Sequence, residues 1–145
     1  MKIRNLEKRD ETAVLNIWLN TSLLAHDFVA AEYWHSKIKD MKDVYLPNSQ
    51  TFVYEENNEV IGFISMVDNY IAAIFIEQQQ RSKGIGKQLI SFIKEHFPIL
   101  ELGVFAKNSG AIAFYKKQGF TIIEEKTDQD TGEQELVMQF KNHFV

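Results

Sequence analysis

The stretch that decides the fold runs from residue 70 to residue 94 and reads YIAAIFIEQQQRSKGIGKQLISFIK. Its first seven residues, Tyr70–Ile76, are nearly all apolar, which is typical of a strand buried on both faces. A short basic loop with two glycines, Gly84 and Gly86, follows. After the loop, apolar residues recur at helical spacing on one face. The stretch predicts a buried strand, a glycine-containing loop and an amphipathic helix.

The loop combines several features of a phosphate-binding site. Backbone N–H groups at a helix N-terminus lack partners within the helix, and the helix dipole adds roughly half a positive charge there. Gly84 and Gly86 let the backbone approach an anion closely, and Arg81, Lys83 and Lys87 add positive charge. Two glycines after a strand are also compatible with a simple turn, and basic side chains with a solvated face.

Two common phosphate-binding motifs are excluded at this loop. A P-loop needs Ser or Thr after its Gly-Lys pair, but Gln88 follows Lys87. The dinucleotide fingerprint needs a third small residue, and Leu89 occupies that position. The loop alone therefore leaves the choice between an anion site and a turn open.

The composition predicts a single domain over residues 1–145, since 145 residues with 45% hydrophobic content can form one sizeable core. A net charge of −4 argues against a nucleic-acid partner. The absence of cysteine excludes disulfides and thiolate metal sites, and no other metal-ligand spacing is present. No apolar run has the length of a signal peptide or a membrane helix, so we expect a cytoplasmic protein with no membrane partner.

Outward from the central stretch, hydrophobic periodicity and turn residues indicate further strands and helices. The expected strands are Ile3–Leu6, Thr51–Glu55, Val60–Val67, Leu100–Phe105, Phe120–Lys126 and Glu135–Phe140. The expected helices are one with Asp10 as its N-cap, one over Ala30–Met41, one after Gly84 and one over Ser109–Gln118, which Gly119 ends. Three hairpin-linked strands before a strand–helix–strand unit predict an α/β (α+β) fold with a mixed sheet covered by helices.

Two motifs carry a resemblance to a known family. Residues Arg81–Gly86 read R-x-x-G-x-G, and residues Asn108–Phe120 read N-x-x-A-x-x-F-Y-x-x-x-G-F. In this order and at this separation, the two blocks resemble the acetyl-CoA motif and the following signature of the GNAT superfamily of N-acetyltransferases. The segment His26-Asp27-Phe28 is similar to a small, uncharacterised bacterial branch. The resemblance implies a twisted sheet of about six or seven strands with about four helices.

The resemblance also implies a cofactor, acetyl-CoA, in a gap between two splayed strands. The strand residues Phe75 and Ile76 would supply backbone groups to the pantetheine arm and the thioester. Asn108 would contact the arm, Phe114 would line the groove, and Tyr115 would also contact the cofactor. The pyrophosphate would be surrounded by Arg81, Ser82, Lys83, Gly84, Ile85, Gly86 and Lys87.

The family's mechanism implies catalytic roles. Tyr115 matches the residue that protonates the departing thiolate, although core packing of its helix would also explain it. His26 is a candidate base, with a capping or packing role as its alternative. Glu101 and a water chain are further candidates, and Asp27 could orient a cationic amine. The expected acceptor-binding residues are His26, Asp27, Phe28 and Tyr70.

The implied function is transfer of an acetyl group to a primary amine of a small molecule or peptide, by direct attack in a ternary complex. A homodimer through the C-terminal strands is a further expectation. One alternative is a GNAT-fold module that binds coenzyme A without catalysis, as a sensor or interaction domain. Another is an unrelated α/β domain in which the motif occurs by chance.

Overall fold

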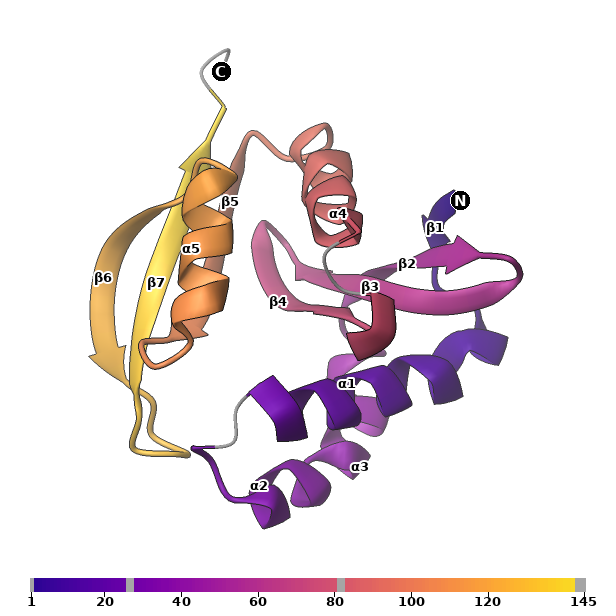
Figure 1. Cartoon of the computed structure of the whole chain (residues 1–145), viewed down its shortest axis with the longest axis horizontal. Helices are drawn as coiled ribbons and strands as arrows, with labels where there is room; N and C mark the ends of the chain where they lie inside the picture. Colours follow the sequence, from indigo (N-terminus) through magenta and orange to yellow (C-terminus); the bar gives the residue numbers. More distant parts are fainter. Residues whose placement is uncertain (1, 26–27, 81–82, 143–145) are drawn as a thin grey trace.

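The computed structural model describes residues 2–25, 28–80 and 83–142, within which seven strands form one sheet (Figure 1). The strand order is β1-β2-β3-β4-β5-β7-β6, and all neighbours are antiparallel except β4 and β5. The strands are β1 (Lys2–Asn5), β2 (Gln50–Glu56), β3 (Glu59–Val67), β4 (Tyr70–Ile76), β5 (Ile99–Phe105), β6 (Thr121–Thr127) and β7 (Gln134–Lys141). The mixed sheet with its hairpins is confirmed.

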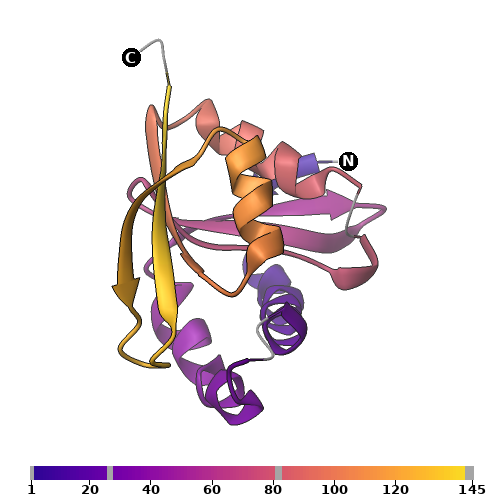
Figure 2. The same cartoon turned by 60° about the vertical axis from the view of Figure 1, so that its left-hand side comes forward.

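Helices cover both faces of this sheet. Figures 1 and 2 show α4 on one side of strands β2 to β4 and α1 on the opposite side, while α5 lies against the half formed by β5, β7 and β6. The helices are α1 (Glu11–Ala25), α2 (Ala31–Ser36), α3 (Ile38–Asp40), α4 (Ile85–Lys94) and α5 (Ser109–Lys117), with short 3-10 turns at Lys8–Asp10 and Gln78–Gln80 and a π-helical turn at Met41–Tyr45.

The core has two parts, one under each helical layer. Under α4 and α5, strand residues such as Ile64 pack against Leu89 and Ile93, which are fully buried. Under α1 and α2, Val14 and Phe63 are fully buried in a second cluster. This division follows from the alternation of side chains along each strand, which sends neighbouring residues to opposite faces.

The prediction that Tyr70–Ile76 is buried on both faces is wrong. Within β4 only Ile71 is buried, whereas β3 is buried continuously from Ile61 to Met66. The reason is that β4 borders an opening in the sheet, so its apolar side chains line a cavity instead of a closed core. An apolar strand sequence does not distinguish these two environments.

Two helix predictions also need correction. The segment Ala30–Met41 is divided into α2, α3 and the start of the π-helical turn, since α2 ends at Ser36, whose hydroxyl donates to the Tyr33 carbonyl at 2.7 Å. Asp10 belongs to a 3-10 turn before α1, and its carboxylate accepts the Glu7 N–H at 2.8 Å together with bonds from Arg4.

Candidate active site

Strands β4 and β5 pair over only two residues of each strand. Tyr70 lies opposite Glu101 and Ile71 lies opposite Leu102, and beyond these pairs the strands diverge (Figure 1). Over the rest of its length, the edge of β4 that faces β5 makes no strand pairing among the described residues. The opening holds a cavity of about 790 Å³, which is in the size range of small-molecule sites. The predicted splay of two strands is confirmed.

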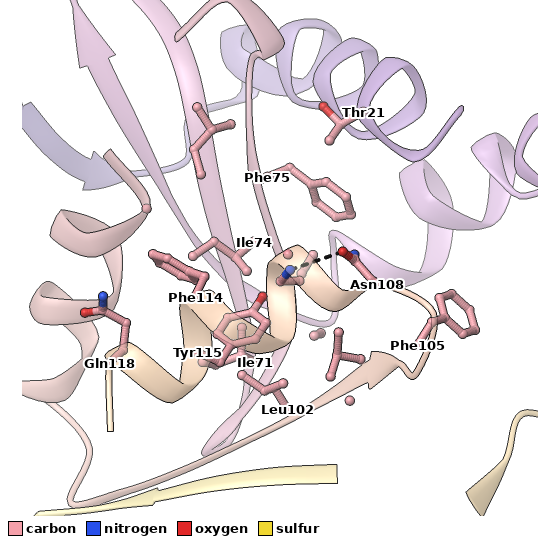
Figure 3. A pocket seen from close by; sticks show the side chains of 18 of the residues that line it. Thr21, Ile71, Ile74, Phe75, Leu102, Phe105, Asn108, Phe114, Tyr115 and Gln118 are labelled. Atoms are coloured by element: carbon pink, nitrogen blue, oxygen red, sulfur yellow. Dashed lines mark hydrogen bonds between the residues drawn. The ribbon is translucent and has the colours of Figure 1, made fainter. Parts of the chain in front are cut away.

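The cavity connects the two helical layers. One end is lined by the first turn of α4 and by α5, and the other end by Trp18, Thr21 and Trp34 from α1 and α2. Figure 3 shows Phe114 and Tyr115 leaving α5 on one side, with Phe75 and Thr21 near α1 on the other. A ligand can therefore enter from one face of the sheet and a second ligand can meet it from the opposite face.

The first turn of α4 presents backbone amides to the cavity. Gly84 is the N-cap residue and has a left-handed φ of 80°, a conformation that favours glycine. No side chain of the described residues caps this helix, so its first amides are available to an anion, as expected for a phosphate site. At Gly86, a β-carbon would stand 3.2 Å from Cζ of Phe114, so the absence of a side chain keeps α4 and α5 close.

The second motif positions α5. The side-chain oxygen of Asn108 accepts the Ala111 N–H at 3.2 Å and caps the helix, a role that its motif position did not reveal. At the other end, Gly119 adopts φ 95° and the Phe120 N–H donates to the Tyr115 carbonyl at 3.0 Å, which confirms the predicted glycine stop. Both Asn108 and Tyr115 line the cavity.

The phenol of Tyr115 is suited to keep its proton. Burial raises the pKa of Tyr115 well above its usual value, because the phenolate would lose hydration. Its ring makes edge contacts with Phe114 and Phe120, at centroid distances of 5.3 and 5.8 Å. Tyr115 thus packs in the core and borders the cavity as well, so the two interpretations from sequence are compatible.

Most of the residues expected to bind the cofactor come together in this cavity. Its lining includes Phe75, Ile76, Gly84, Ile85, Gly86, Lys87, Asn108, Phe114 and Tyr115. Lys83 is exposed beside it and donates to Oε1 of Gln80 at 3.0 Å. Arg81 and Ser82, as well as the proposed acceptor residues His26 and Asp27, lie outside the described residues. Phe28 packs edge-on against Phe105 at 5.4 Å, a neighbour of the cavity.

Sequence reasoning missed one acidic residue at this site, Glu135. This residue lines the cavity, and its carboxylate lies over Gly103, where the hydroxyl of Tyr70 also lies. Burial and the negative charges of Glu135 and Glu101 raise the pKa of Tyr70, against an opposing hydrogen bond from the Gly103 backbone. Glu101 itself accepts from Gln139 Nε2 at 3.0 Å, in the closed part of the sheet. No local sequence pattern indicated that Glu135 belongs to this site, because the register between β5 and β7 brings it beside the cavity.

Two further features concern residues 2–25, 28–80 and 83–142 only. Among them, no group of three His, Asp or Glu side chains is arranged to hold a metal ion. None of the helices they form has the length and apolar character needed to span a membrane.

Comparison with known proteins identifies the family. Residues 47–122 match the acetyltransferase (GNAT) domain. The chain is 37% identical over 123 residues to the peptidyl-lysine N-acetyltransferase YiaC of Escherichia coli (strain K12), covering 84% of each chain. Its structure resembles the solution structure of apo YjaB from Escherichia coli, with a TM-score of 0.85, 25% identity and 97% of each chain covered.

A third relative was solved with its ligand. It is a putative streptothricin acetyltransferase from Bacillus anthracis str. Ames in complex with acetyl coenzyme A. It is 26% identical to this chain, with a TM-score of 0.58 and 68% of each chain covered. A solved relative of this chain therefore binds acetyl coenzyme A.

Proposed function

The chain belongs to the GNAT family of acetyl-CoA-dependent N-acetyltransferases, and from this premise we propose that it acetylates lysine side chains of proteins or peptides. The observation that carries the proposal is the cavity that passes through the sheet between β4 and β5. It offers an anion-binding helix terminus on one face and an opening lined by aromatic residues on the other. The 37% identical YiaC, named a peptidyl-lysine N-acetyltransferase, supports lysine as the acceptor.

The residues present fit coenzyme A on the face that carries α4 and α5. The uncapped amides at Gly84, Ile85 and Gly86 suit the pyrophosphate, with Lys87 adding positive charge. Arg81, Ser82 and Lys83 belong to the same loop and complete this part of the proposal. The open edge of β4 at Phe75 and Ile76 suits the amide groups of the pantetheine arm, beside Asn108 and Phe114.

Catalysis then requires a proton donor for the departing thiolate. Bound acetyl-CoA supplies an acyl group on a thiol leaving group. Tyr115 donates its phenolic proton to the departing sulfur, and its raised pKa keeps that proton available across the physiological range. A positioned acid of this kind contributes on the order of 10²–10⁴-fold in rate. His26 and Asp27 remain candidates for acceptor binding from the segment between α1 and α2.

The domain organisation, the oligomeric state and the cellular location remain predictions. The seven described strands share one sheet, which supports a single domain over residues 1–145. A homodimer and a cytoplasmic location also stay predictions.

The test is a thiol-release assay with acetyl-CoA and three acceptors. These are an N-terminally acetylated peptide with one lysine, the same peptide with norleucine in place of lysine, and n-butylamine. We expect turnover with the lysine peptide and none with the norleucine peptide, and mass spectrometry should locate the new acetyl group on the lysine side chain. Coenzyme A binding without turnover on any amine would instead support the non-catalytic sensor.

A further inference from the structure

Two polar side chains meet over a single residue of strand β5, Gly103. A β-carbon built on Gly103 would lie 2.8 Å from the hydroxyl oxygen of Tyr70 and 2.8 Å from Oε2 of Glu135. These residues come from β4, β5 and β7, which the sheet brings side by side. Because Gly103 has no side chain, a phenol and a carboxylate share the space above its backbone. Glu135 also lines the cavity that passes through the sheet.

Side-chain alternation places this carboxylate on the face opposite the coenzyme A loop. Along β5, Leu102 and Val104 pack into the cluster under α4, whereas Phe105 packs into the cluster under α1. Glu135 lies directly across from Phe105 in the antiparallel β5–β7 pair, so it points to the same face as Phe105 and Gly103. With coenzyme A on the α4 face, an acceptor has to arrive on the α1 face, where Glu135 stands.

The charge of Glu135 is available to a ligand. Its described ion-pair partner is Lys126, at 3.7 Å, and the two side chains are 20% and 54% exposed. Such an open pair is screened by water and contributes little. An incoming ammonium ion in the cavity can therefore replace Lys126.

The groups in and beside the cavity suit the other parts of a lysine side chain, with Tyr70 adjoining the lining residues Gly103 and Glu135. An ammonium group has three donors, and the Tyr70 hydroxyl oxygen and the Glu135 carboxylate are two acceptors that meet at one place. The apolar walls contributed by Trp18, Trp34 and Phe75 match the four-carbon stem, which prefers an apolar surface. Glu101 is a poorer candidate for binding the ammonium, because its carboxylate accepts a hydrogen bond from Gln139 where β4 and β5 are still paired.

Resting on the proposed lysine acetylation, we propose that Glu135, together with Tyr70, binds the acceptor ammonium and that the Glu135 carboxylate takes its proton. The proton passes from the ammonium to Glu135 and then to solvent. The neutral nitrogen bonds to the acyl carbon while the carbon–sulfur bond breaks. Sulfur takes the Tyr115 proton, and the tyrosine recovers the second proton that the nitrogen releases. The products are an amide, a thiol and one proton in solvent.

The test compares Glu135→Gln with Glu125→Gln, which removes an exposed charge from the same hairpin. Calorimetry measures binding of the lysine and norleucine peptides to protein saturated with coenzyme A. We expect Glu135→Gln to weaken binding of the lysine peptide roughly tenfold or more. Binding of the norleucine peptide should stay within about twofold of that of the wild type. Its kcat should fall roughly 10²-fold, with coenzyme A affinity unchanged, while Glu125→Gln behaves as wild type.

Two results would overturn the assignment. One is a Glu135→Gln variant whose kcat/KM stays within about threefold of wild type. The other is an equal loss of lysine and norleucine peptide binding, which marks a structural effect. If the wild type acetylates n-butylamine but no peptide, lysine acetylation of proteins fails as the function. The role of Glu135 is then decided by comparing Glu135→Gln with Glu125→Gln in the acetylation of n-butylamine. A wild type that acetylates neither acceptor overturns both proposals.

Discussion

Gly86 and Phe114 are in contact across the junction of α4 and α5. The ring atom Cζ of Phe114 lies 3.2 Å from the point where a β-carbon at Gly86 would stand, and Cδ1 of Ile76 lies 3.4 Å from it. This contact joins the two motifs of the sequence at one wall of the cavity. It also explains why a residue without a side chain is needed in the first turn of α4.

Gly86→Ala is expected to weaken coenzyme A binding. The new methyl group must displace Phe114, and overpacking of this kind costs about 1–3 kcal/mol, which corresponds to roughly 5- to 150-fold if all of it appears as lost affinity. Calorimetric titration with coenzyme A measures the change. Adding Phe114→Leu to the Gly86→Ala protein should restore part of the loss, because the smaller side chain makes room. Equal affinity of Gly86→Ala and wild type would contradict the packing argument.

Tyr115→Phe should lower kcat roughly 10²-fold and leave the coenzyme A dissociation constant nearly unchanged. The variant keeps the ring contacts with Phe114 and Phe120 and removes only the hydroxyl group. Steady-state kinetics and calorimetry provide the two numbers. Tyr45→Phe, which removes the hydroxyl of a tyrosine that is 51% exposed, is the control. An unchanged turnover of Tyr115→Phe would reject the role as an acid.

Gly103→Ala is expected to raise the KM for the acceptor several-fold while coenzyme A affinity stays the same. Its methyl group would lie 2.8 Å from both the Tyr70 hydroxyl and Oε2 of Glu135, so these two side-chain ends must move apart. Because both are ends of side chains, the free energy of unfolding should change by only about 1 kcal/mol. Kinetics at saturating acetyl-CoA and urea denaturation test the two parts. An acceptor KM equal to that of wild type would show that the acceptor does not use this point.

Asp10→Asn should destabilise the fold at neutral pH more than at acidic pH. Arg4 donates two hydrogen bonds to the Asp10 carboxylate, at 2.7 and 3.1 Å, and a third to Glu55 at 2.9 Å. The Arg4 bonds hold the pKa of Asp10 below its usual value. A carboxyl with a lowered native pKa stabilises the protein above its unfolded pKa, near 3.9, and that stability is lost as the pH falls through the native pKa.

The expected loss for Asp10→Asn is about 2 kcal/mol at pH 7. This value is lower than that of a fully buried pair because Arg4 is 11% exposed and keeps Glu55 as a second ion-pair partner. Urea denaturation at pH 7 and at about pH 3 measures the difference between variant and wild type. The exposed Asp40→Asn serves as the control. A loss of the same size at both pH values would show that packing, and not charge, is responsible.

The central loop and helix could be predicted because their signals are local. The glycines at 84 and 86 and the apolar face of α4 lie within a few residues of one another, and so do Asn108 and Gly119 around α5. Spacing within a helix follows from its geometry and needs no knowledge of the rest of the chain. The same holds for the hairpin turn at Asn57 and Asn58, which both adopt positive φ.

Predictions failed where burial depended on distant partners. Tyr70–Ile76 has the composition of a strand buried on both faces. However, β5 diverges from β4 after Ile71, so the rest of β4 borders the cavity. Ala30–Met41 has helical spacing throughout, but it bends so that Trp34 and Met41 both reach the cluster under α1. Propensity describes what a segment can form, and packing selects among those forms.

The sequence by itself determined the family, and it predicted the glycine-containing loop before α4 and the position of Tyr115 on α5, because each depends on short-range spacing or on a motif of neighbouring residues. Only the tertiary structure decided that Glu135 shares a point above Gly103 with Tyr70. The register of β7 against β5 and the divergence of β4 create that meeting place. Such registers are set by contacts between segments far apart in the chain, so no local pattern could encode them.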